Sequence, residues 1–80
     1  MKDEKNFKVV LKNDDVSSFD KVIASLVTVC QHNMLQAEQC ATIIQYKGKC
    51  SVKEKLTHDD ARQYGKILSE IGLTVTVTEM

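Results

Sequence analysis

Residues 73–78 alternate strictly between apolar side chains and threonines, a pattern with few structural interpretations other than a β-strand. Leu73, Val75 and Val77 fall on one side of an extended chain, and the threonines between them fall on the other. Valine and threonine are β-branched and favour strands. The segment therefore predicts a strand with one apolar face.

Two other segments have strand character. Residues 7–12 are rich in valine and alternate in the same way, with Val10 opposite the main apolar face. Residues 49–53 are shorter, with Cys50 and Val52 on one face and lysines on either side. Flanking lysines are typical of a strand at the edge of a sheet. The sequence thus predicts three strands.

Three capping patterns predict three helices between these strands. Each pattern pairs a polar residue with Gln or Asp three positions later, so that the side chain of the first caps a helix. The pairs are Ser17 with Asp20, Asn33 with Gln36, and Thr57 with Asp60. The helices are predicted to end near residue 31, at residue 47 and at residue 71. Gly48 and Gly72 would close the last two in the left-handed conformation.

The predicted order is β-α-α-β-α-β, and we expect an α+β fold. Its most economical arrangement is a three-stranded antiparallel sheet with three helices packed on one face. A chain of 80 residues, 42% of them hydrophobic, forms one small domain. We expect residues 1–6 to be a short flexible tail and residues 7–80 to be the domain. No segment suggests association, so we expect a monomer.

Composition excludes several classes of partner. Lysine and arginine total 11, as do aspartate and glutamate, which argues against a broad basic surface for nucleic acid or anionic membranes. No apolar run is long enough to span a membrane, and the polar start shows no signal peptide. We therefore expect a cytoplasmic protein.

The sequence does not suggest an enzyme. Cys30, Cys40 and Cys50 lack the close pairing of zinc ligands, so we expect no metal site and interpret them as small apolar residues in a reducing compartment. His32 and His58 lie at predicted helix boundaries, not next to a candidate nucleophile. The three glycines form no phosphate-binding loop. We expect no cofactor.

The triplet Asn13-Asp14-Asp15 lies between the first strand and the first helix. Asn and Asp form turns because their side chains bond to their own backbone, so the triplet is explained by turn chemistry alone. Two carboxylates and an amide between packed elements also make a receptor for a cation. The residues by themselves leave both interpretations open.

A wider pattern includes this triplet. Its members are residues 7–15, Phe19, Val22, Leu26, Ala37, residues 47–49 and, near the end of the chain, Gly72, Leu73 and Glu79. Together they resemble the Clp protease adaptor family, ClpS, over nearly the whole domain. The segments 36–40 and 46–53 are similar to a bacterial subgroup of that family.

The resemblance implies an adaptor and not an enzyme. Such adaptors bind proteins whose first residue is large and hydrophobic (an N-degron) and deliver them to an ATP-dependent Clp unfoldase, of ClpA or ClpC type. An α-amino group has a pKa of about 8 and is mostly a cation at neutral pH. Carboxylate and amide oxygens can bond that ammonium, whereas an internal peptide nitrogen has one donor and no charge.

Carried over position by position, the resemblance implies two sets of site residues. The first set would hold the amino terminus: Asn13, Asp14, Asp15 and Gln45. The second set would line an apolar pocket for the first side chain: Ser17, Phe19, Val22, Ala41, Ile44 and Thr74. Phe19 falls at the mouth of this pocket, where the family commonly has Met. Without the resemblance, helical spacing favours plain core packing for Phe19, Val22 and Ile44.

Three departures from the family pattern affect this site. Gln45 replaces a His that bonds the substrate's amino group; its amide oxygen can still accept an N–H, but it cannot titrate. Ala41 is smaller than the usual large apolar residue. The segment before Phe7 is shorter than the arm that many members use in delivery.

The second half of the sequence also resembles another protein-interaction module. Residues 52–55, 59–61 and 68–72 are similar to the C-terminal domain of the bacterial ribosomal stalk protein, which shares the adaptor fold. The first half argues against this alternative, because residues 35–40 lack the glycine- and lysine-rich stretch of the stalk domain.

Overall fold

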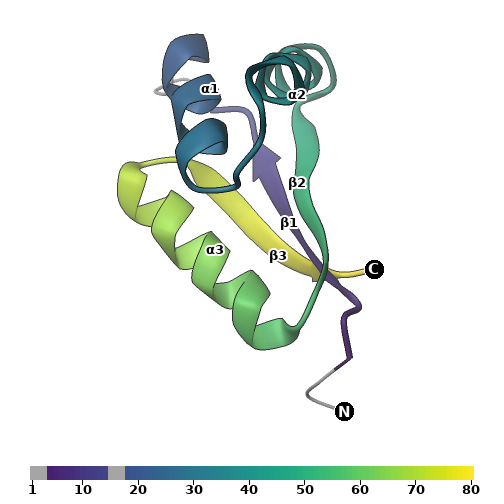
Figure 1. The fold of residues 1–80 in the computed structure, drawn as a ribbon. Helices are drawn as coiled ribbons and strands as arrows, with labels where there is room; N and C mark the ends of the chain where they lie inside the picture. Colours follow the sequence, from purple (N-terminus) through teal and green to yellow (C-terminus); the bar gives the residue numbers. More distant parts are fainter. Residues whose placement is uncertain (1–3, 15–17) are drawn as a thin grey trace.

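The six predicted elements are present in the predicted order (Figure 1). The computed structural model describes residues 4–14 and 18–80. The elements are β1 (Phe7–Lys12), α1 (Phe19–Thr28), α2 (Met34–Lys47), β2 (Lys49–Leu56), α3 (His58–Ile71) and β3 (Thr74–Glu79).

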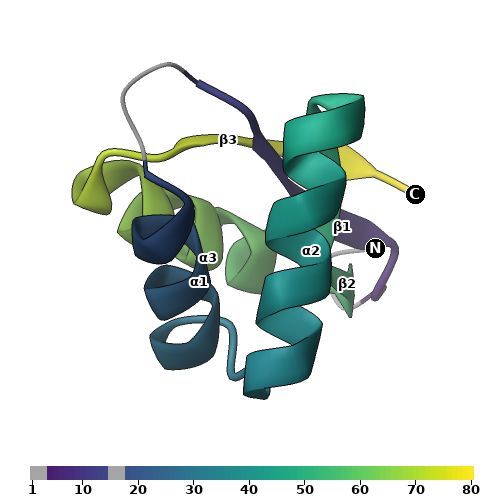
Figure 2. The same ribbon diagram turned by 90° about the horizontal axis from the view of Figure 1, so that it is seen from above.

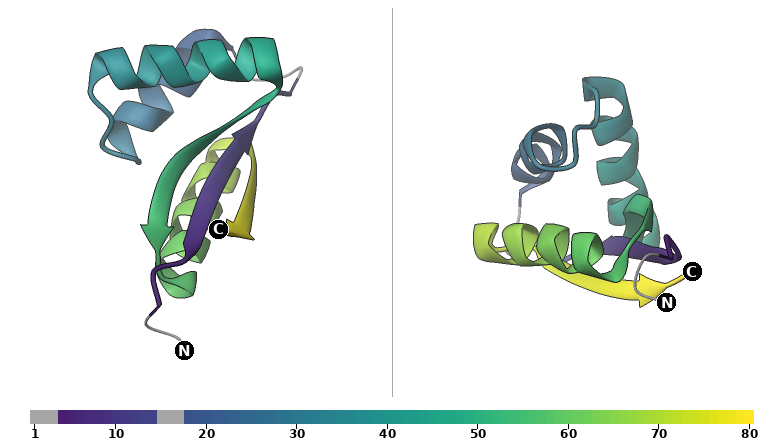
Figure 3. Two further views of the ribbon diagram at one scale, coloured as in Figure 1. Left: turned by 90° about the vertical axis from the view of Figure 1, so that its right-hand side faces the viewer. Right: turned by 60° about the horizontal axis from the view of Figure 1, so that its bottom comes forward.

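The strands form one antiparallel sheet in the order β2-β1-β3. The central strand β1 pairs with β3 in an unbroken register, from Phe7 opposite Glu79 to Lys12 opposite Thr74. Its pairing with β2 is interrupted by shifts on either side of Val9. The sheet is strongly twisted, as the left view of Figure 3 makes clear. The predicted three-stranded antiparallel sheet is confirmed.

The helices occupy two positions against this sheet. Helices α1 and α2 lie side by side at the end of the sheet where β1 ends, and α3 runs below α1 (Figures 1 and 2). Apolar residues of all six elements meet in one core, because each helix turns its apolar stripe inward. The fully buried members of that core include Val9, Leu11, Leu26, Ala61 and Leu68. The α+β class and the β-α-α-β-α-β order are therefore confirmed.

Side-chain caps define most helix boundaries. Asn33 and Gln36 form the predicted reciprocal capping box, and the Thr57 side chain accepts from the backbone N–H of Asp60. Gly48, at φ 86°, and Gly72, at φ 105°, close α2 and α3 in the left-handed region as predicted. Glycine suits both positions because it has no Cβ to clash there.

The first helix begins and ends at other residues than predicted. Its cap is Ser18, whose side chain accepts from the Lys21 N–H at 3.1 Å, so the prediction of Ser17 as cap is wrong. The helix ends at Thr28, before the predicted residue 31. Gln31 adopts φ 60°, and the His32 N–H bonds to the Leu26 carbonyl. The residue in the left-handed conformation after this helix is not a glycine, so the sequence carries no glycine to mark the end of the helix.

Strand β2 is longer than predicted, reaching Leu56 and not residue 53. The shifts opposite Val9 break its alternation, and Lys55 adopts φ 57°. An irregular strand does not keep the strict two-residue period on which the prediction relied. The boundaries of β3 differ from the prediction by one residue at each end.

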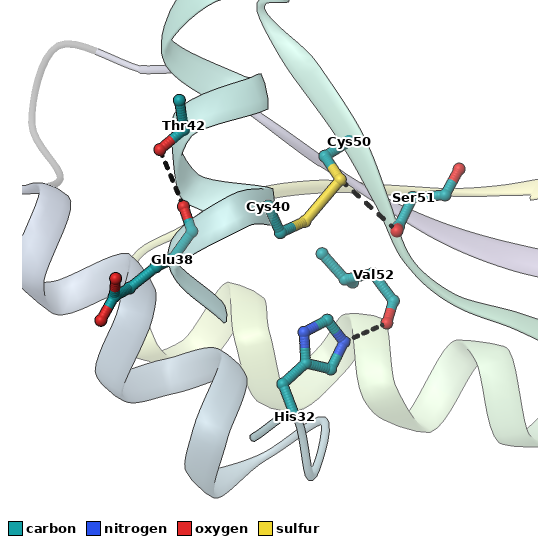
Figure 4. The surroundings of a disulfide bond; sticks show 7 residues. All are labelled: His32, Glu38, Cys40, Thr42, Cys50, Ser51 and Val52. Carbon is teal, nitrogen blue, oxygen red and sulfur yellow. Dashed lines mark hydrogen bonds between the residues drawn. A yellow bond between two sulfur atoms is a disulfide. The ribbon is translucent and has the colours of Figure 1, made fainter. Parts of the chain in front are cut away.

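The prediction of three unpaired cysteines is wrong. Cys40 of α2 and Cys50 of β2 form a disulfide, with Cα atoms 6.0 Å apart (Figure 4). The ten-residue spacing alone does not predict this pair, because the turn at Gly48 is what folds β2 back along α2. Cys30 is a free, buried thiol, as expected. The disulfide links the helix that carries Ala41 and Ile44 to an edge strand of the sheet.

Candidate functional site

Two of the predicted site residues meet where β1 ends and β3 begins. Asp14 follows β1, and Thr74 is the first residue of β3. The Thr74 hydroxyl donates a hydrogen bond to Asp14 Oδ2 at 3.1 Å, across 60 positions of sequence. The Asp14 side chain is half-buried. This contact holds one carboxylate oxygen in place, while a carboxylate has acceptor sites for further donors.

Asn13 is fixed through its backbone. Its N–H donates to the carbonyl of Gly48 at 2.8 Å, and the preceding residue, Lys12, pairs with Lys49 of β2. The turn after α2 and the loop after β1 are thereby joined. Asn13 is exposed, and it immediately precedes Asp14 in the sequence.

The two helices at this end of the sheet supply the predicted apolar residues. Phe19, the first residue of α1, is 36% exposed, whereas Val22, Ala41 and Ile44 are 9%, 2% and 4% exposed. The last three belong to the common core, as helical spacing alone favours. Gln45 follows Ile44 on α2 and is exposed. A pocket floor made by these core residues stays a prediction.

The predicted residues Asp15 and Ser17 lie outside the described residues. Among the others, the structure joins Asn13 to Gly48 and Asp14 to Thr74, and it groups Val22, Ala41 and Ile44 in one core cluster. The amide and carboxylate therefore lie at the end of the sheet next to the helices that carry the apolar residues (Figure 1).

A second constellation contains a cysteine and a histidine. Cys30 and His32 line one shallow pocket with residues of β2. Burial raises the pKa of the Cys30 thiol to about 11, and the Lys53 ammonium acts in the opposite direction. The His32 Nε2 lies 2.7 Å from the Val52 carbonyl, so that nitrogen donates to the backbone (Figure 4). A protonated thiol and an imidazole committed to β2 do not make an activated nucleophile.

Metal-ligating side chains do not gather in the part of the chain that the structure describes. No group of three or more His, Cys, Asp or Glu residues there could hold a metal ion. Among residues 4–14 and 18–80, no helix has the length and apolar character needed to cross a membrane.

Comparison with protein families decides the identity of the domain. The family model "ATP-dependent Clp protease adaptor protein ClpS" matches residues 2–76. The chain belongs to the ClpS family. The match includes the second half of the sequence, so it replaces the stalk-protein alternative. ClpS proteins are adaptors of the Clp protease and not proteases themselves.

A solved ClpS structure has the same fold. Agrobacterium tumefaciens ClpS2, bound to L-phenylalaninamide, superimposes with a TM-score of 0.81 over 96% of this chain and 99% of that one. The two sequences are 22% identical, so the likeness is one of fold. No curated protein matches this chain.

Two features of the site were missed in the sequence. The first is the Asp14–Thr74 hydrogen bond, because a contact between the first loop and the last strand depends on β3 lying beside β1. The second is the disulfide at Cys40, immediately before Ala41. A pair of cysteines ten residues apart around a helix-closing glycine was the available signal for it.

Proposed function

We propose that this ClpS-family chain binds proteins through a large hydrophobic N-terminal residue and delivers them to an ATP-dependent Clp unfoldase for degradation. The observation that carries the proposal is the position of Asp14, held by Thr74 and adjacent to the anchored Asn13. In this proposal, Asn13, Asp14, Asp15 and Gln45 bind the α-amino group.

The selectivity follows from charge and from the number of donors. An α-ammonium has three N–H donors and a positive charge, and hydrogen bonds to charged groups are worth about 1.5–3 kcal/mol each. An internal peptide nitrogen would offer one uncharged donor and leave acceptors unpaired. Sites built on polar pairing reject such analogues strongly. Recognition of a free amino terminus is therefore the discrimination that these acceptors favour.

The apolar half of the site selects the first side chain. Phe19 is partly exposed at the start of α1, whereas Val22, Ala41 and Ile44 are buried. In this proposal Thr74 also lines the pocket, and Ser17 forms its rim. Burying a Leu or Phe side chain contributes about 1.5–3 kcal/mol. The preferred substrates are therefore expected to begin with Phe, Leu, Tyr or Trp.

Delivery requires a second partner, an AAA+ unfoldase of ClpA or ClpC type. Family membership supports this pairing, because the family is defined by its work with the Clp protease. We propose that the adaptor acts as a cytoplasmic monomer. Incubation with ClpP and each unfoldase in turn, with a substrate that begins with Leu, tests delivery. Equal degradation rates with and without the adaptor would contradict it.

The binding step is tested with one pair of peptides. A fluorescent peptide with a free N-terminal Leu is titrated against its N-acetylated twin, and only the free peptide should bind. Equal affinities, or no binding of either, would overturn the proposal. Asp14→Ala should cost on the order of 2 kcal/mol of binding, because a charge-assisted bond is lost. Glu70→Ala, at an exposed position of α3, removes a carboxylate elsewhere and should leave the affinity unchanged.

A further inference from the structure

The sheet has a second face that α3 does not cover. In the left view of Figure 3 the strands lie in front of α3, which is seen behind them. The register fixes which residues lie on this face. Lys12 pairs with Lys49 and Thr74, Val10 with Ser51 and Thr76, and Lys8 with Thr78. These residues alternate with Val9 and Leu11, which are buried in the core on the other side.

This face forms a groove bordered by α2. The lining includes Lys8, Val10 and Lys12 of the central strand, Lys49 and Ser51 of β2, threonines of β3, and Ile43 of α2. Val10 is buried at its floor, whereas Ile43 is 41% exposed. The groove thus has an apolar centre with hydroxyl groups around it.

The charge of the groove is strongly one-sided although the whole chain is neutral. Three lysines line it, against one carboxylate, that of Glu79 at the far end of β3. Lys12 and Lys49 are direct cross-strand partners. Directly opposed residues have Cβ atoms about 4.5–5.5 Å apart, and like charges in such pairs are destabilising. An anion placed between these two ammonium groups would relieve that repulsion.

The spacing of the lysines defines the kind of ligand that fits the groove. Lys8 and Lys12 are four residues apart on one strand, which corresponds to about 13 Å at 3.3 Å per residue. Val10 lies midway between them, on the same face. An extended peptide has the same rise per residue. Its residues i and i+4 therefore reach Lys8 and Lys12, while its residue i+2 reaches the apolar centre at Val10.

We propose that this groove binds an extended acidic segment of a partner protein with the pattern acidic-x-apolar-x-acidic. One carboxylate lies between Lys12 and Lys49, the other contacts Lys8, and the apolar side chain contacts Val10 and Ile43. This binding mode differs from that of the amino-terminus site, because no α-amino group takes part, although the two surfaces adjoin where Lys12 pairs with Thr74.

The lining favours a polypeptide over other polyanions. Single-stranded nucleic acid binds through aromatic side chains on which bases stack, and the residues lining this groove include no aromatic one. Anionic membranes attract clusters of four to eight basic residues on an open surface. Here only three lysines surround a small apolar centre.

The test uses a labelled, N-acetylated and C-amidated peptide of sequence Glu-Thr-Leu-Thr-Glu, which cannot use the amino-terminus site. We expect it to bind, with an affinity that falls as salt rises. Its Lys-Thr-Leu-Thr-Lys twin should not bind. The double variant Lys12→Glu/Lys49→Glu should lose at least tenfold in affinity, and Lys8→Gln should weaken binding by a smaller factor.

A matched control distinguishes binding in this groove from an effect of the protein's net charge. Lys21→Glu/Lys66→Glu makes the same change in charge on α1 and α3 and should keep the wild-type affinity, with thermal melting confirming that all variants fold. Absence of binding, equal binding of the basic twin, or equal losses in both double variants would overturn the proposal. Tighter binding of an oligo-dT strand or of phosphatidylglycerol vesicles through the same lysines would overturn it as well.

Discussion

The hydroxyl of Thr74 donates to the carboxylate of Asp14 at 3.1 Å, which connects the first residue of the last strand to the loop after the first strand. The contact exists because β3 pairs with β1 in a register that sets Thr74 opposite Lys12. A carboxylate fixed in this way does not have to be ordered when a ligand arrives. The sheet register therefore preorganises the polar half of the proposed site.

Removing this hydroxyl should weaken peptide binding without changing charge. For Thr74→Val we expect a loss of about 0.5–1.5 kcal/mol in the affinity for a peptide with a free N-terminal Leu, because Asp14 loses its positioning bond. Titration of the fluorescent peptide measures it. Thr76→Val, two residues along the same strand, is the matched control and should bind like wild type. Equal losses in the two variants would show that the effect comes from the strand and not from Asp14.

Local signals predicted most of the fold. The capping pairs Asn33 with Gln36 and Thr57 with Asp60 act within one helical turn, and Gly48 and Gly72 act at one backbone position each. Such signals are complete within a few residues of sequence. Ser17 and Ser18 are adjacent, and the carboxylate three positions after Ser17 favoured the wrong one of the two as the cap. The left-handed turn at Gln31, which follows the end of α1, has no glycine to mark it in the sequence.

Long-range contacts could not be predicted in the same way. The Cys40–Cys50 pair depends on β2 folding back along α2, and the Asp14–Thr74 bond depends on strand order. The site residues themselves came from resemblance to the ClpS family, because apolar spacing on a helix cannot distinguish Ile44 in a core from Ile44 in a pocket floor.

With Gln at position 45, one source of pH dependence in the peptide affinity should be absent and another should remain. Between pH 5.5 and 7.5 we expect the wild-type affinity for the free N-terminal peptide to be flat, since Gln does not titrate, and to fall above about pH 8 as the α-amino group loses its proton. In Gln45→His, affinity should drop below about pH 6.5, where an imidazolium would repel the ammonium. Fluorescence titrations at half-unit intervals measure both profiles. Identical profiles below pH 7 would show that residue 45 does not contact the amino group.

The Cys40–Cys50 disulfide should contribute substantially to stability. A cross-link that closes a loop of this length lowers the conformational entropy of the unfolded chain and thereby stabilises the fold by about 2–3 kcal/mol. Reduction with dithiothreitol should therefore lower the melting temperature by roughly 10–20 °C for a domain of this size. Cys30→Ala should respond to dithiothreitol as wild type does, and Cys40→Ser/Cys50→Ser should not respond. A wild-type melting temperature that is the same with and without reductant would contradict the prediction.

Cys30 should be protected from modification by its burial. Its thiol is 1% exposed, and burial raises its pKa from 9.0 to about 11, with Lys53 acting in the opposite direction. Since the thiolate is the reactive form, iodoacetamide at pH 8 should alkylate Cys30 slowly in the folded protein and rapidly in guanidinium chloride. Mass spectrometry of timed samples measures both rates. Fast alkylation of the folded protein would show that the thiol opens to solvent.

The raised pKa of the Cys30 thiol also makes the stability of the fold depend on pH. Well below pH 9.0 the thiol is protonated in both the folded and the unfolded chain and has no effect on the pH profile. Between pH 9.0 and about 11 the unfolded chain loses this proton while the folded chain keeps it, so the free energy of unfolding should fall as pH rises. Urea melts of wild type and Cys30→Ala over this range isolate the effect, because lysines and tyrosines titrate equally in both. We expect the wild-type curve to fall more steeply, and parallel curves would show that Cys30 ionises alike in the folded and unfolded chains.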